Sequence, residues 1–144
     1  MVIYADASFL VALYVVQADS PKAVACLRGQ TAPLAFTSFH RHELRNAIRL
    51  CVFRKDISSY QCRQALREME NDLDGGILVH TPLAWTETLQ KAEELGAANT
   101  EIMGIRSLDL FHIASALNLK TTLFLTFDVH QRALAEKSGL KVKP

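Results

Sequence analysis

Four acidic residues stand at the ends of predicted elements and are the strongest candidates for chemistry. Asp6 directly follows a short apolar run, and Asp128 comes one residue after another. Glu43 and Asp109 lie near the starts of two predicted helices. Carboxylates, water and substrate phosphate are the ligands that Mg²⁺ and Mn²⁺ prefer. Such a cation can lower the pKa of a bound water and stabilise charge on a phosphate during an in-line displacement.

Asp109 is the most unusual of the four, because it lies on an apolar helix in the segment RSLDLFHIASAL. At about 100° per residue, Ile113 and Ala116 lie nearly in line with it. Burying a carboxylate is costly unless a partner pairs with it or coordinates it, and crowded carboxylates repel one another. A hard cation would relieve both costs. We expect four apolar residues to bury this helix: Leu108, Leu110, Ile113 and Leu117.

Each acid taken singly also has a purely structural interpretation. Asp6 and Asp128 suit the N-cap positions of the helices that follow them. Asp109 would complement the dipole at a helix start, and Glu43 would be an ordinary flanking residue. Only the mutual placement of the four acids favours a functional site, and that placement depends on the fold.

Short apolar runs alternate with longer segments of helical periodicity along the whole chain. The predicted strands are residues 2–5, 34–38, 77–80, 122–127 and 140–142. The predicted helices are residues 8–16, 20–28, about 39–54, 59–73, 84–95 and 107–117, with a last one that ends at Gly139. Ser20, Ser58 or Ser59, and Ser107 are the expected N-caps.

This alternation predicts an α/β fold, a three-layer sandwich with a parallel sheet covered by helices on both faces. In such a sheet, ligands bind beyond the carboxyl ends of the strands, where the helix N-termini also lie. All four acids map to that edge. Their convergence is the main functional signal in the sequence.

The bulk composition describes an ordinary globular domain. The 144 residues are 49% hydrophobic and 22% charged, with a formal net charge of +1. This overall charge is uninformative about partners, so any binding of RNA or DNA would have to come from local basic patches. Three cysteines, Cys26, Cys51 and Cys62, lack metal-binding spacing and suit a reducing, cytoplasmic setting. The apolar N-terminus lacks a basic region, and Asp6 interrupts it. We expect no membrane span.

Together the motifs resemble the PIN-domain nucleases, and most closely the VapC-type toxins of toxin–antitoxin pairs. Four segments carry this resemblance, in order and over essentially the whole chain: YADASFL with Asp6 and Ser8, HELRNAI with Glu43, RSLDLFHIASAL with Asp109, and LFLTFDVHQRALAEKSGLKV with Thr126 and Asp128.

The resemblance implies a single PIN-like domain over residues 1–144, with five strands in the order 3-2-1-4-5. It implies that the four acids hold one or two Mg²⁺ or Mn²⁺ ions for endoribonuclease activity on RNA. Ser8, Thr126 and His112 are the candidate supporting residues of this site. The position of His112 is equally typical of a histidine that is simply packed in the core. It also implies a homodimer and a cognate antitoxin protein that blocks the site.

Other interpretations remain open at this point. Arg41, Arg45 and Arg49 recur every four residues, but the helical wheel places them away from Glu43, which favours a solvated face or a protein contact over RNA. A housekeeping RNA-processing nuclease would carry the same motifs. A phosphoryl-aspartate phosphatase needs a second aspartate where Ser8 stands, and a receiver needs an aspartate at the end of the third predicted strand, where ILVHT offers none. A binding module without catalysis would not need four acids.

Overall fold

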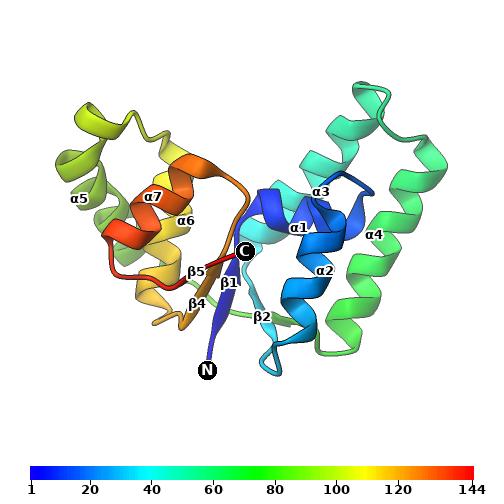
Figure 1. Cartoon of the computed structure of the whole chain (residues 1–144), viewed down its shortest axis with the longest axis horizontal. Helices are drawn as coiled ribbons and strands as arrows, with labels where there is room; N and C mark the ends of the chain where they lie inside the picture. The colour runs from blue at the N-terminus through cyan, green and yellow to red at the C-terminus, as the bar shows by residue number, and fades with distance from the viewer.

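The computed structural model, which describes residues 1–144, is built from five short strands and seven helices (Figure 1). The strands are β1 (Ile3–Ala5), β2 (Leu34–Phe36), β3 (Leu78–His80), β4 (Leu123–Leu125) and β5 (Val142–Lys143). The helices are α1 (Ala7–Tyr14), α2 (Ser20–Arg28), α3 (Ser38–Phe53), α4 (Ser59–Asp74), α5 (Trp85–Met103), α6 (Ser107–Asn118) and α7 (Val129–Lys137).

All neighbouring strands pair in parallel, in the order β3-β2-β1-β4-β5, which confirms the predicted sheet. The central strand β1 pairs on both sides, with Ile3 opposite Leu34 of β2 and Leu123 of β4. Because every strand runs the same way, the carboxyl ends of β1 and β4 meet at one edge. Asp6 and Asp128 follow those two ends.

Alternate residues of β1 and β4 enter two separate cores, one on each face of the sheet. Ile3 and Leu125 pack with α1–α4, whereas Tyr4 and Phe124 pack with α6 and α7. Figure 1 shows these helix groups on opposite sides of the sheet, with α5 outside α6. The three-layer α/β sandwich is therefore confirmed, and it explains why β1 and β4 are apolar at every position.

Helix α5 is longer than predicted, reaching Met103 instead of Leu95. The prediction ended it before Gly96, but that glycine lies inside the helix. A Cβ there would lie 3.2 Å from the Leu110 side chain of α6, so Gly96 allows α5 and α6 to approach closely. The helix ends instead at Gly104, whose φ of 65° is the left-handed conformation that favours glycine.

Two details at the start of α6 also differ from the predictions. Ser107 is the first helical residue, and Arg106 occupies the N-cap position without a side-chain capping bond. Leu108 is 54% exposed, so it does not help to bury the helix, whereas Ile113 and Ala116 are fully buried. Helix α6 is buried on all sides from Phe111 to Ala116, where it lies between the sheet and α5, and Leu108 lies in the exposed first turn before that run. Ser20 likewise begins its helix and does not cap it.

None of the seven helices is both long enough and apolar enough to cross a membrane.

Candidate functional site

Asp6 lies at the carboxyl end of β1 and is fully buried. It caps α1, because Oδ1 accepts hydrogen bonds from Phe9 N at 3.0 Å and Ser8 Oγ at 2.6 Å. Its other oxygen, Oδ2, accepts from Thr126 Oγ1 at 2.5 Å. Burial raises the pKa of the Asp6 carboxyl, and the nearby His112 ring and these hydrogen bonds act in the opposite direction. Asp6 is thus both a helix cap and a rigidly held buried acid.

Ser8 and Thr126, the two predicted supporting residues beside Asp6, join β1 to the turn that follows β4. Thr126 Oγ1 accepts a hydrogen bond from Asp128 N at 2.9 Å, and Ser8 Oγ accepts one from Phe127 N at 3.1 Å. Each hydroxyl therefore donates to Asp6 and accepts from the T-x-D segment. Hydroxyl groups can do both at once, which is why residues of this type are needed here.

Glu43 owes its position to the way α3 begins. Thr37 caps the helix and forms a capping box with His40, whose Nδ1 accepts from Thr37 N at 3.0 Å. The other ring nitrogen, Nε2, lies 2.9 Å from the Ala5 carbonyl of β1 and donates to it. Burial lowers the pKa of His40 to about 3, so the ring is neutral. The start of α3 is thereby fixed to the end of β1, one turn before Glu43.

His112 of α6 contacts Glu43 directly. Its Nε2 lies 2.6 Å from Glu43 Oε1, and its Nδ1 lies 2.8 Å from the Tyr4 hydroxyl. His112 is only 1% exposed. His112 is therefore a packed core histidine and also a hydrogen-bond partner of Glu43. Its role as a supporting residue of a metal site stays a prediction.

Asp109 is 7% exposed, although it carries a carboxylate. Its Oδ1 accepts from Gln131 Nε2 at 3.0 Å, and its Oδ2 accepts from Arg106 Nε at 3.1 Å. Gln131 Oε1 is buried without a hydrogen-bond partner. Neither Gln131 nor Arg106 was expected at the site. The only signal for Gln131 is its place in the first turn of α7, three residues after the Asp128 cap, and that place does not identify Asp109 as its partner.

Asp128 is placed differently from the other three acids. It caps α7, and its Oδ1 accepts from His130 N at 2.8 Å and Gln131 N at 2.9 Å. Asp128 also lies close enough to Arg106 to help Asp109 raise the pKa of that guanidinium. The structural interpretation of Asp128 as a cap is therefore correct, and Arg106 connects it electrostatically to Asp109.

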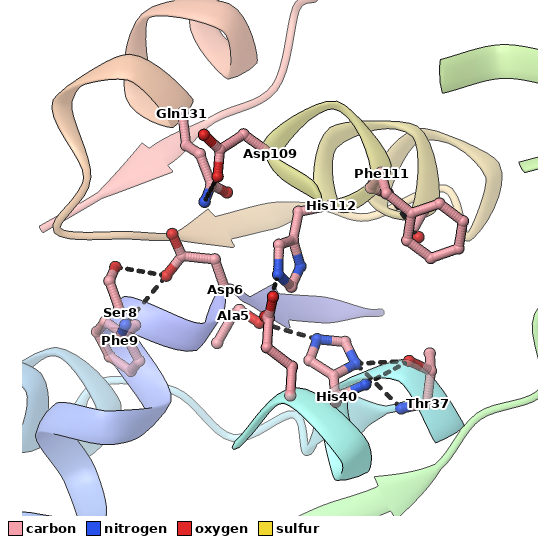
Figure 2. A network of polar contacts seen from close by, with 12 residues as sticks. Ala5, Asp6, Ser8, Phe9, Thr37, His40, Asp109, Phe111, His112 and Gln131 are labelled. Carbon is pink, nitrogen blue, oxygen red and sulfur yellow. Dashed lines mark hydrogen bonds and ion pairs between the residues drawn. The ribbon is translucent and has the colours of Figure 1, made fainter. Parts of the chain in front are cut away.

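Glu43 and Asp109 line one cavity of about 760 Å³ at this edge of the sheet. Figure 2 shows Asp6, Asp109 and His112 converging on the same region from three elements. Polar residues from several elements complete the wall of this cavity: Ser8, Gln17, Asp19, Arg54, Asp56 and Arg106. The tertiary fold thus brings two of the four predicted acids, Glu43 and Asp109, to one cavity. Asp6 and Asp128 lie at the same edge of the sheet but do not line this cavity, so the four-acid site stays a prediction.

The residues around this cavity fit a hard divalent cation by their donor chemistry. The available groups are carboxylate and hydroxyl oxygens, together with the unpaired amide oxygen of Gln131. The thiol of Cys51 also lines the cavity, but burial raises its pKa, which disfavours the thiolate that would bind a metal. No group of three or more Asp, Glu, His or Cys side chains is gathered closely enough to enclose a metal ion. Each carboxylate is instead held by protein donors, so the predicted ligand set remains a prediction.

The arginine stripe of α3 faces away from this cavity. Arg41 Nη2 and Arg45 Nη1 both contact Glu70 Oε1 of α4, at 2.5 and 3.2 Å. Arg49 lies with them along a separate cavity of about 370 Å³. Its lining is entirely polar: Ser38, Arg41, His42, Arg45, Asn46 and Arg49. Arg41 and Arg45 thus form an intramolecular contact that fastens α3 to α4. The preference for a solvated face or a protein partner over RNA stays a prediction.

Comparison with known proteins agrees with this geometry. A protein-family model, the PIN domain, matches residues 3–137. The chain belongs to the PIN-domain family. This membership makes it a PIN-domain nuclease, and it leaves the receiver and phosphatase interpretations without support. No curated protein sequence matches the chain significantly.

Several solved structures share the PIN fold at low sequence identity. VapBC-1 from nontypeable Haemophilus influenzae is 17% identical with a TM-score of 0.63, over 99% of this chain and 97% of that one. VapBC2 from Rickettsia felis, solved bound to a DNA fragment from its promoter, is 16% identical with a TM-score of 0.66, over 99% and 98%. FitAcB from Neisseria gonorrhoeae is 14% identical with a TM-score of 0.64, over 99% and 96%. The PIN domain described here is therefore similar in fold to VapC toxins.

Proposed function

We propose that this PIN domain is a Mg²⁺- or Mn²⁺-dependent endoribonuclease. The observation that carries the proposal is the convergence of acids from β1, α3, α6 and the start of α7 on one edge of the sheet. These acids hold the cation directly or through water: Asp6, Glu43, Asp109 and Asp128. A bound cation supplies an activated water and neutralises charge on the phosphate.

The chain's own residues prepare the site for that chemistry. Hydroxyl donors fix the carboxylate of Asp6, and an amide and a guanidinium fix that of Asp109. Arg54 and Arg106 line the same cavity and would attract the phosphates of an RNA chain, because cationic side chains draw the backbone toward them. No side chain is needed as a covalent nucleophile.

Cleavage of unstructured RNA by the purified protein tests this proposal. With Mn²⁺ or Mg²⁺ added, the wild type should cut RNA internally, and Asp6→Asn and Asp109→Asn should each reduce cleavage to background while remaining folded by circular dichroism. Asp74→Asn, at the exposed end of α4, is the matched control and should cleave like the wild type. Full activity in both site variants would exclude this metal site.

We further propose that the protein is the toxin of a toxin–antitoxin pair and acts in the cytoplasm as a homodimer. The similar VapBC and FitAcB structures are toxin–antitoxin complexes, which supports a cognate antitoxin that blocks the acidic cavity. Expression of the chain alone should arrest growth, and Asp6→Asn or co-expression with the product of a short upstream open reading frame should restore it.

The proposed homodimer is tested by light scattering of the purified protein, which should give a molecular mass twice the 16.0 kDa of one chain.

RNA cleavage in vitro without growth arrest would favour the second candidate, a housekeeping RNA-processing nuclease, because both functions would use the same acids.

A further inference from the structure

A buried hydrogen-bonded chain leads from the core to the rim of the acidic cavity. Tyr4 is completely buried in the centre of the sheet, and its hydroxyl lies 2.8 Å from His112 Nδ1. The opposite ring nitrogen, His112 Nε2, lies 2.6 Å from Glu43 Oε1. Glu43 is the only member of the three with substantial exposure, at 21% of its side chain. The chain therefore ends on a carboxylate that faces the cavity.

With a neutral His112 ring, one arrangement of protons satisfies both hydrogen bonds of this chain. The Tyr4 phenol carries its proton at neutral pH and can donate it to His112 Nδ1. A neutral imidazole that accepts at Nδ1 carries its own proton on Nε2. His112 Nε2–H then donates to Glu43. Tyr4 thus sets the tautomer that lets His112 hold the carboxylate.

Aromatic packing keeps the His112 ring from turning. The Phe39 ring lies 4.9 Å away and the Tyr4 ring 5.7 Å away, the latter edge-on. Tyr4 itself stacks on Phe124 at 5.6 Å and contacts His40 at 4.5 Å. Rings enclosed in this way cannot rotate without moving the core, because protein interiors are close-packed. The direction of the Nε2–H bond toward Glu43 is therefore built into the fold.

We propose that His112 and Tyr4 are positioning residues that hold Glu43 ready for a divalent cation, an inference that rests on the proposed function. The contact with His112 engages Oε1, so Oε2 of Glu43 stays available to the cavity. Outer partners of this kind orient metal-binding side chains, and their loss commonly weakens metal affinity by about 10–100-fold.

Two substitutions of the same histidine separate positioning from packing. The amide nitrogen of His112→Gln reaches about as far as Nε2, so it can still donate to Glu43, whereas that of His112→Asn reaches only as far as Nδ1. Titration calorimetry of Mn²⁺ into the full chain, without RNA, should show affinity about 10–100-fold weaker for His112→Asn. His112→Gln should recover most of that loss. Equal weakening in both variants would overturn the proposal.

A double-mutant cycle with Glu43→Gln gives a readout that a structural role would not move. If His112 acts through Glu43, adding His112→Asn to Glu43→Gln should weaken Mn²⁺ binding by less than twofold further, because contacting residues of one network are non-additive. A full additional loss in the double variant would show that His112 acts on the fold and not on Glu43.

Tyr4→Phe keeps the test decisive if His112→Asn does not fold, since it removes a single oxygen from the buried ring. It should weaken Mn²⁺ binding several-fold with the RNA concentration for half-maximal cleavage unchanged. If folded Tyr4→Phe binds Mn²⁺ with wild-type affinity, the role of Tyr4 is overturned. If His112→Asn also fails to fold, that same result overturns the whole proposal. A wild type that neither binds Mn²⁺ nor cleaves RNA would instead reject the proposed function itself.

Discussion

Asp6 shows how one side chain serves the local structure and the site together. Its Oδ1 caps α1, and its Oδ2 accepts from Thr126, which follows β4 and lies 120 residues away in the sequence. The same is true of Asp128, which caps α7 at the same edge. A helix N-terminus attracts carboxylates, and in a parallel sheet the helix N-termini lie beside the strand ends. The structural and functional interpretations of these acids are therefore not alternatives.

Thr126 should be sensitive to the loss of its hydroxyl. Thr126→Val removes a donor to Asp6 and an acceptor for Asp128 N, and leaves both groups unsatisfied in or near the core. We expect the free energy of unfolding in urea to fall by about 1–3 kcal/mol. Thr126→Ser keeps the hydroxyl and should lose only about 1 kcal/mol for the missing methyl. Equal stability of Thr126→Val and wild type would contradict this account.

His40 should make the protein sensitive to acid. Its pKa is lowered to about 3 in the folded protein, chiefly by burial, whereas an unfolded chain has a histidine pKa of about 6.5. Between these values only the unfolded state binds the proton. The free energy of unfolding should therefore fall as the pH falls from about 6.5 toward 3, by at most about 1.4 kcal/mol per pH unit.

His40→Gln is the variant that isolates this effect, because glutamine at the same position also completes a capping box. Its unfolding free energy should depend less steeply on pH in that window. Asp6 acts with the opposite sign, since its raised pKa makes the folded state bind the extra proton, but it is present in both proteins. Parallel pH profiles for wild type and His40→Gln would refute the assignment.

At the scale of elements, α6 carries the largest share of the site. It presents Asp109 to the cavity and His112 to Glu43, while Ile113 and Ala116 bury its inner stripe. The close approach of α5 at Gly96 supports its outer side. The direction of α6 depends on the short turn after Gly104.

Gly104 should therefore tolerate substitution poorly, although a side chain there has room. A Cβ would meet nothing within 4 Å, so the cost of Gly104→Ala comes from the positive φ alone. We expect a loss of about 1–2 kcal/mol in unfolding free energy. Gly104→Asn should lose less, because asparagine adopts this conformation more readily. Equal losses for both would show that something other than backbone conformation matters.

For the whole molecule, the acidic cavity predicts a coupling between metal binding and stability. A ligand that binds only the folded state raises the free energy of unfolding, by about 2.7 kcal/mol at 100 times its dissociation constant. Urea unfolding with saturating Mn²⁺ should show a rise of this order in the wild type. Asp109→Asn should lose most of it. An unchanged rise in that variant would place the cation elsewhere on the protein.

Much of this architecture could be predicted from the sequence, because its signals are local or periodic. The alternation of apolar runs with helical segments determined the parallel sheet, and the acids next to those runs determined the edge where a site should form. The errors arose where local signals compete with packing. Gly96 was predicted to end a helix, but it lies inside α5 and allows close contact with Leu110. Leu108 was predicted to be buried, but it lies in the exposed first turn of α6.

The sequence by itself therefore determined the fold class and pointed to the four acids as the proposed site, since both follow from residue type and spacing. Only the tertiary structure decided which side chains hold those acids. Gln131 is 22 residues from Asp109, and His112 is 69 residues from Glu43. No local pattern encodes such pairs, because they depend on how helices of fixed phase are rotated against the sheet by close packing. That rotation turns a buried histidine and a tyrosine of the core toward the rim of the acidic cavity.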